Sequence, residues 1–267
     1  MSFRFAAALV MTGFLVPITL QAQTVSVPWT EAQKELKDTE ADLAKGGILT
    51  MKDHRESLDK ALTDGATAFP LPPAADGTET VLVDGLAENL LVVLAASKNK
   101  DKTATAFNPY PRIALYLGIY YDEIGDAESA LRALDSGLKL DAFKGADLGA
   151  TVPAIYSEQA AAYSKLKRWA DSLASCDAGL KIKSLQKSDH ARLLRSRGFA
   201  LVELNRLDEA ETSYFESLKI EPENQVALHE MGYINELRET GNKADPTIVL
   251  PPPASKTDSD KPPPKPI

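Results

Sequence analysis

The chain has 267 residues and a formal net charge of −8, because 38 acidic residues outnumber 30 basic ones. Nucleic acids and anionic membranes attract proteins with a net positive field, so we expect neither as a partner. The single cysteine, Cys176, excludes an internal disulfide.

The first 22 residues have the composition of a secretory signal peptide. Arg4 is their only charge, an apolar run of 16 residues follows from Phe5 to Leu20, and the segment ends on the small residue Ala22. We expect cleavage after Ala22 and a periplasmic or secreted protein that is not stably inserted in a membrane. A retained anchor is the alternative, but the apolar run is short for the ~20 residues that a spanning helix needs.

Two amphipathic helices are predicted after the signal peptide. Apolar residues at helical spacing place the first at Thr30–Lys45, closed by Gly46, and the second at Thr50–Asp64, closed by Gly65. Each apolar strip is too narrow to hold a pair of helices together alone. The two therefore form a hairpin that docks on the rest of the chain, which we prefer, or pairs with another chain.

A Pro-, Ala- and Gly-rich connector follows at Ala66–Thr80. After it, the apolar run Val81–Val83 leads into a segment that predicts a buried helix at about Gly85–Lys98, with Asp84 as its N-cap. We expect this helix to cover the first of the repeats that come next, because an end repeat otherwise exposes one hydrophobic side.

A block of residues recurs three times between Pro111 and Pro222. Its clearest copy contains Leu194, Arg197, Gly198, Leu201, Asn205, Leu207, Ala210, Tyr214, Leu218 and Pro222. The copies align on a small residue at Gly118, Ala160 and Gly198, with Gly232 beginning a truncated fourth copy, at intervals of 42, 38 and 34 residues. Small residues at these places let two helices approach closely, and bulky ones fill the space beside them.

The alignment also predicts a turn between two helices in each copy. The turn falls at Gly125, Lys167 and Asn205. Cys176 occupies the place that Leu134 and Tyr214 hold in the other copies, which favours a core residue over a reactive thiol.

These positions resemble the tetratricopeptide repeat family, whose unit is two antiparallel helices in ~34 residues. The intervals of 42 and 38 residues are longer than this unit, and their extra residues lie in the links Asp141–Val152 and Lys183–Asp189. The resemblance covers Pro111 to Gly241 and implies an all-α solenoid of about three helical hairpins, followed by a capping helix at Asn224–Glu239. We divide the chain into a signal peptide (1–22), an N-terminal hairpin with its connector (23–80), a capping helix and loop (81–110), the solenoid (111–241) and a tail (242–267).

The tail is rich in proline, including Pro251–Pro253 and Pro262–Pro264. Proline lacks an amide donor and fixes one backbone torsion, so we expect a disordered tail that samples polyproline II. It is either a solvated spacer, which we prefer, or a ligand for an aromatic-lined groove.

In the tetratricopeptide family the first helices of successive repeats line a concave groove, so the resemblance implies a peptide-binding groove here. Its candidate residues are Leu115, Ile119, Arg192, Arg195, Phe199, His229 and Tyr233. The two arginines would pair with a carboxylate or an acidic side chain, and an apolar residue would pack on the rings. The alternative is that the arginines pair inside the groove with Glu203 and Glu236.

One role known in the family is set aside. Its members that bind chaperone tails clamp a terminal carboxylate with lysine and asparagine from the first helix. Further basic and asparagine groups beyond the first helix complete that clamp. In this chain Leu115 and Ile119 occupy the places of the first lysine and asparagine, and Ser196 occupies one of the later basic places. The chain therefore lacks residues that this role needs.

The sequence offers little for catalysis. The three histidines, His54, His190 and His229, lie on different predicted elements, and Tyr233 stands where a zinc-protease helix that starts at His229 would need its second histidine. We expect no cofactor, no metal and no enzymatic activity.

The sequence therefore predicts a non-catalytic adaptor or chaperone-like protein that binds extended peptide segments of envelope proteins. The alternative is a structural envelope assembly factor that oligomerises through the N-terminal hairpin. A less favoured third possibility is an enzyme that uses the repeats as a docking arm.

Overall fold

The computed structural model describes residues 28–68, 73–74, 76–84, 86–141, 151–182 and 185–241. The expected signal peptide and the Pro-rich tail lie outside these residues. Among the helices described, none is both long enough and apolar enough to cross a membrane.

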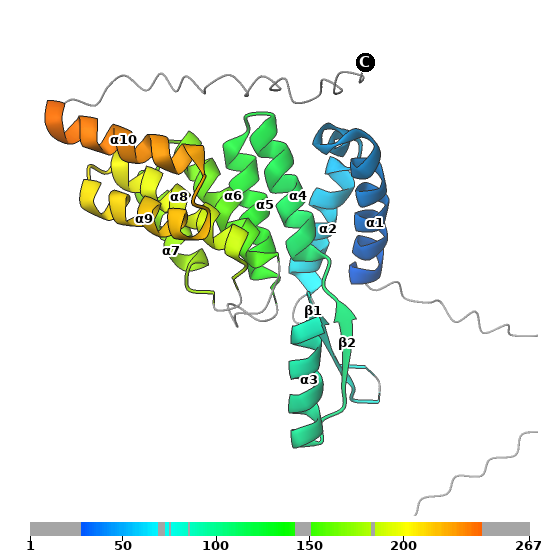
Figure 1. Ribbon diagram of the computed structural model, residues 1–267. Coiled ribbons are helices and arrows are strands. Elements are labelled where there is room, and N and C mark those ends of the chain that lie inside the picture. Colours follow the sequence, from blue (N-terminus) through cyan, green and yellow to red (C-terminus); the bar gives the residue numbers. More distant parts are fainter. Residues whose placement is uncertain are drawn as a thin grey trace, which may run out of the picture.

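The body of the molecule is a row of helical hairpins (Figure 1). The hairpins are α4 (Tyr110–Glu123) with α5 (Ala127–Lys139), α6 (Val152–Lys165) with α7 (Trp169–Gly179), and α8 (Lys187–Glu203) with α9 (Leu207–Ile220). Helix α10 (Gln225–Thr240) packs on α9 and ends at Gly241 in the left-handed conformation, which is a common helix stop. The predicted tetratricopeptide-like, mainly helical solenoid with a capping helix is confirmed.

Small residues bring the two helices of a hairpin together, as the alignment predicted. A Cβ atom at Gly118 would lie 2.5 Å from the side chain of Leu134, and one at Gly198 would lie 2.7 Å from the ring of Tyr214. Gly232 is different, because a Cβ atom there would meet nothing within 4 Å. The expectation that Gly232 serves close packing is wrong, since this residue lies on an exposed part of the last helix of the row.

The predicted turns share one backbone conformation. Gly125, Lys167 and Asn205 have φ angles of 82°, 56° and 58°. This left-handed region is open to glycine and tolerated by asparagine, but it is unfavourable for lysine. The middle hairpin therefore has the same turn as its neighbours in spite of its less suitable residue.

Cys176 lies in the core of this middle hairpin and is fully buried. Burial raises the pKa of its thiol to about 12, so the sulfur stays protonated near neutral pH. The prediction of a core residue is confirmed.

The N-terminal hairpin consists of α1 (Pro28–Gly46), the short 3₁₀ helix η1 (Ile48–Asp53) and α2 (Arg55–Ala68). Its residues Met51 and Leu58 are fully buried in the same core cluster as Ile113 and Leu117 of α4. The preferred docking within the chain is therefore confirmed. The hairpin packs its apolar strips on the first repeat, and oligomerisation through the hairpin stays a prediction.

The predicted end of the second helix at Gly65 is wrong. Helix α2 continues to Ala68, and Gly65 is buried inside it. A Cβ atom at Gly65 would lie 2.5 Å from the ring of Tyr110, so this glycine makes room for α4 instead of ending α2.

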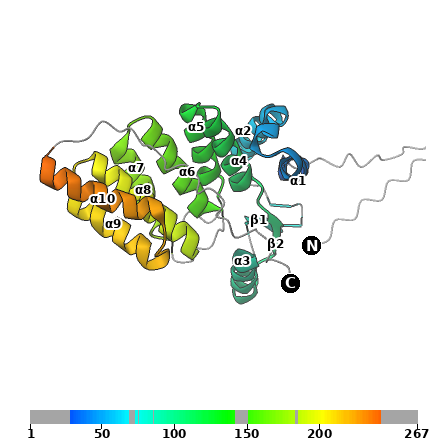
Figure 2. The same ribbon diagram turned by 45° about the horizontal axis from the view of Figure 1, so that its top comes forward.

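Residues 79–107 form a small βαβ unit that the sequence did not predict. Strand β1 (Glu79–Val83) pairs in parallel with β2 (Thr103–Phe107), with Glu79 opposite Thr103 and Val83 opposite Phe107. Helix α3 (Leu86–Asn99) connects the strands, packs on them and projects away from the solenoid (Figures 1 and 2).

The expectation that a helix in residues 81–110 covers the first repeat is therefore wrong. The apolar run before Asp84 is a strand, because its β-branched residues pair with a second strand about twenty positions later. The N-terminal hairpin covers the first repeat instead. Asp84 is buried, and its carboxylate accepts a hydrogen bond from the backbone N–H of Thr151 at 3.3 Å.

Candidate functional site

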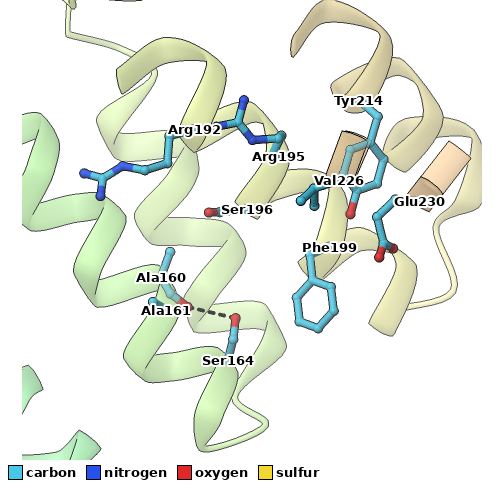
Figure 3. A pocket seen from close by; sticks show the side chains of 10 residues that line it. All are labelled: Ala160, Ala161, Ser164, Arg192, Arg195, Ser196, Phe199, Tyr214, Val226 and Glu230. Atoms are coloured by element: carbon cyan, nitrogen blue, oxygen red, sulfur yellow. Dashed lines mark hydrogen bonds between the residues drawn. The ribbon is translucent and has the colours of Figure 1, made fainter. Parts of the chain in front are cut away.

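A cleft of about 460 Å³ lies where α6, α8 and α10 meet (Figure 3). Small residues of α6, longer side chains of α8 and two residues of α10 line it, together with one tyrosine of α9. These residues are Ala160, Ala161, Ser164, Arg192, Arg195, Ser196, Phe199, Val226, Glu230 and Tyr214. The cleft thus joins the first helices of two successive repeats to the capping helix.

Three of the predicted site residues, Arg192, Arg195 and Phe199, line this cleft. Two others lie on α10 outside the lining: His229, whose side chain is 72% exposed, and the half-buried Tyr233. The last two, Leu115 and Ile119, are half-buried on α4, in another repeat. The structure therefore brings together the part of the predicted set that lies on α8.

Both arginines form ion pairs within the protein. Nη1 of Arg192 donates to Oε1 of Glu158 on α6 at 2.9 Å. Nη1 of Arg195 donates to Oε2 of Glu221 at 2.6 Å and to Oγ of Ser217 at 3.3 Å. The alternative of internal pairing is thus realised with partners other than the predicted Glu203 and Glu236.

These pairs leave part of each arginine side chain exposed. The side chain of Arg192 is 39% exposed and that of Arg195 is 19% exposed. A guanidinium carries five N–H donors, so a single carboxylate does not exhaust it. Both arginines can therefore hold their internal partner and offer donors to a ligand in the cleft.

Two carboxylates near the cleft are partly withdrawn from water. Burial raises the pKa of Glu158, although the charge of Arg192 acts in the opposite direction. Burial also raises the pKa of Glu230, against the opposing effects of His229 and of the hydrogen bond to Tyr214. Of the partners of the arginines, Glu158 lies on α6 and Glu221 directly follows the end of α9, and no local sequence signal pointed to them.

The wall between the charged ends is apolar. Phe199 packs edge-on against Trp169, with ring centroids 5.8 Å apart and planes at 79°. Ala160 and Ala161 of α6 line the same cleft, and their short side chains leave space in it. Figure 3 shows the arginines at one end of the cleft and Phe199, Tyr214 and Glu230 at the other.

The cleft offers hydrogen bonds, ion pairs and an apolar surface. The described residues contain no cluster of three or more histidine, cysteine, aspartate or glutamate side chains arranged to hold a metal ion. Such a combination of groups suits the recognition of an extended polypeptide, which presents charged, apolar and backbone groups in succession.

The fold is that of a tetratricopeptide-like solenoid, and comparison with known proteins returns similar helical repeats. No protein family model matches the sequence. RNA polymerase II-associated protein 3 of Mus musculus is 28% identical over 119 residues, which are 45% of this chain and 16% of the mouse protein. The chain therefore matches only a small part of that relative.

Solved structures show the same kind of likeness. The first TPR domain of human RPAP3 is 23% identical, with a TM-score of 0.43 over 51% of this chain and 98% of that domain. The first TPR of Spaghetti (RPAP3), solved with the HSP90 peptide SRMEEVD, is 22% identical, with a TM-score of 0.43 over 49% of this chain and 97% of that one. MamA AMB-1 is 15% identical, with a TM-score of 0.42 over 79% of this chain and 82% of its own.

Proposed function

We propose that this protein is a non-catalytic adaptor that binds an extended peptide segment of a partner protein in the cleft between α6, α8 and α10. The observation that carries the proposal is the order of groups along the cleft. The two partly exposed arginines lie at one end, the carboxyl group of Glu230 lies at the other, and an apolar wall separates them.

The order of groups along the cleft defines the groups that the ligand must present. An acidic side chain pairs with Arg192 and Arg195, an apolar side chain packs against Phe199, and a hydrogen-bond donor reaches Glu230.

Selection of peptides tests the proposal directly. Random peptides of about a dozen residues, displayed on phage, are selected on residues 23–267, and the enriched peptides are measured by titration. We expect Ser196→Trp, which fills the cleft without changing its charge, to weaken binding at least about tenfold, or about 1.4 kcal/mol. The matched control is Thr212→Trp on the exposed side of α9, which should bind like the wild type. Equal binding by both variants, or no enriched peptide, would sink the proposal.

We also propose that the protein acts after export, in the periplasm or outside the cell, on partners of the cell envelope. The proposal is supported by the basic start, apolar run and small residue within 1–22. The full chain, expressed in a bacterial host, should release a protein that begins at Gln23 into the osmotic-shock fraction. A protein that still begins at Met1 and stays in the cytoplasmic fraction would overturn this part alone.

A further inference from the structure

A groove of about 540 Å³ lies between α2 and α5, and its lining shares no residue with that of the cleft. Its floor is apolar. Leu62 and Ala133 are buried there, and the exposed Ala66 follows Leu62 by one turn of α2. A concave site of this size, with an apolar floor and a few polar groups on its walls, is typical of those that bind small molecules.

Helices α2 and α5 run in the same direction along this groove. Gly65 of α2 lies against the ring of Tyr110 at the start of α4, and Asp59 reaches Tyr121 near the end of α4, so α2 is antiparallel to α4. Helix α5 is antiparallel to α4 as well, because the two form a hairpin. The amide of Asp126, the N-cap of α5, donates to the carbonyl of Tyr121 at 2.8 Å. Asp59 is therefore level with the start of α5.

The α2 wall of the groove offers hydrogen-bond acceptors. Oδ2 of Asp59 accepts from the hydroxyl of Tyr121 at 2.5 Å, which leaves Oδ1 available. The hydroxyl of Thr63 donates to the carbonyl of Asp59, and that of Thr67 donates to the carbonyl of Thr63, each at 3.0 Å. Their protons are thus engaged within the helix, while their oxygen atoms can still accept. This wall therefore suits a ligand group that carries several N–H donors and a positive charge.

The α5 wall offers donors through Arg132. This side chain is exposed, and its Nη2 donates to Oγ of Ser129 at 2.7 Å. Arg132 has no carboxylate at ion-pair distance in the part of the chain that the structure describes, in contrast to Arg192 and Arg195. A guanidinium has five N–H donors, so further donors are available to a ligand. Asp59 and Arg132 thus line one groove without pairing with each other.

We propose that this groove binds a free α-amino acid with an apolar side chain. The ammonium group donates to Asp59 and Thr63, the carboxylate accepts from Arg132, and the side chain packs on the apolar floor. A free amino acid fits better than a chain segment, because it carries both charges on one carbon atom. Asp59 is level with the start of α5 and Arg132 lies in its second turn, so the two differ by roughly one turn, or ~5.4 Å, along the helix.

The bound amino acid also connects two parts of the fold. Asp59 belongs to the N-terminal hairpin and Arg132 to the first repeat, so a ligand that contacts both holds these parts together. A ligand that binds the folded chain and not the unfolded one stabilises it by mass action. We therefore expect the temperature of unfolding to rise with the concentration of the amino acid.

Titration calorimetry of residues 23–267 with L-leucine tests the proposal. We expect binding that saturates below about 10 mM leucine, together with a higher temperature of unfolding. The matched ligands are N-acetyl-leucine, which lacks the ammonium group, and leucinol, which lacks the carboxylate. Each should bind at least about tenfold more weakly than leucine. No binding at about 10 mM leucine, or equal binding by either matched ligand, overturns the proposal.

Substitutions locate the site. Arg132→Gln and Asp59→Asn each remove one charge and should weaken leucine binding at least about tenfold, whereas the control Arg206→Gln, in another repeat, should bind like the wild type. Ala66→Trp, at an exposed residue, should fill the groove and abolish leucine binding while peptide binding in the cleft persists. Ser196→Trp should do the reverse, so this proposal and the proposed function fail separately. Leucine binding that survives both Arg132→Gln and Ala66→Trp overturns the assignment to this groove.

Discussion

Arg192 on α8 and Glu158 on α6 form an ion pair between two successive repeats, with Nη1 and Oε1 2.9 Å apart. The pair lies at the cationic end of the cleft, where it connects the site to the packing of the repeats. A substitution of Arg192 therefore changes both the ligand-binding surface and the stability of the solenoid, and the two effects need separate measurements.

We expect Arg192→Glu to lower the free energy of unfolding by about 1–2 kcal/mol, because the new carboxylate would face Glu158. The loss is smaller than that for a fully buried pair, since Arg192 is 39% exposed. Urea denaturation followed by circular dichroism measures it. The exchanged pair, Arg192→Glu with Glu158→Arg, should recover most of the loss. If the exchanged pair recovers stability but still binds peptide weakly, Arg192 belongs to the binding site. If the exchanged pair is as unstable as Arg192→Glu alone, the ion pair with Glu158 does not explain the loss of stability.

The sequence predicted the cluster on α8 but not its partners. Arg192, Arg195 and Phe199 were found because the family resemblance implies that these positions of a first helix face the groove. Glu158 and Glu221 approach them only through the packing of neighbouring helices, which is not encoded at any fixed spacing. The same resemblance placed His229 and Tyr233 in the groove, but α10 presents Val226 and Glu230 to the cleft instead.

The two glycines Gly198 and Gly232 should respond in opposite ways to the same substitution. Gly198→Ala should cost about 1–3 kcal/mol, because its Cβ atom would lie 2.7 Å from the ring of Tyr214. Gly232→Ala should add about 0.5–1 kcal/mol, because nothing lies within 4 Å of the new atom and alanine favours a helix more than glycine does. Thermal unfolding of both variants decides the matter. Equal effects at the two positions would mean that helix propensity, and not close packing, governs Gly198.

The parts of the fold that the sequence predicted are those with local or repeated signals. The small residues at Gly118 and Gly198 and the three turns define each hairpin within a few tens of residues. The βαβ unit escaped, because the alternating Thr103–Phe107 has a weak strand pattern and its parallel partner lies a whole helix away. The apolar content of α3 suggested burial, whereas the structure leaves Leu90, Leu91 and Leu94 exposed.

Lys167 offers a test of backbone strain in the turn of the middle hairpin. Its φ angle is 56°, in a region that costs a side chain with a Cβ atom roughly 1–2 kcal/mol. Lys167→Gly should stabilise the protein by about 0.5–1 kcal/mol, since glycine relieves the strain but loses more chain entropy on folding. Asn205→Gly, with φ of 58° at the wild-type residue, is the matched control and should gain less, because asparagine tolerates this conformation. Differential scanning calorimetry measures both, and a larger gain at Asn205 would contradict the explanation.

His54 should make the stability of the N-terminal hairpin depend on pH. Its Nδ1 lies 3.0 Å from Oε1 of Glu35, and its Nε2 lies 3.1 Å from Oδ2 of Asp42. Burial of the ring alone lowers its pKa, but the hydrogen bonds and charges of the two carboxylates outweigh burial, so the pKa of His54 is raised above its usual value. The folded protein thus holds this proton more tightly than the unfolded chain. The extra stability is present below the unfolded pKa of about 6.5 and is lost as the pH rises through the folded pKa.

The variant His54→Gln keeps a polar side chain but cannot carry the charge. We expect the wild type to exceed this variant in free energy of unfolding at about pH 6, and the difference to shrink steadily towards about pH 9. Urea denaturation at several pH values gives both curves, and restricting the series to values above about pH 5.5 avoids the range in which carboxyl groups usually titrate. A difference that is constant over this range, or that grows as the pH rises, would show that the proton on His54 does not hold α1 to the start of α2.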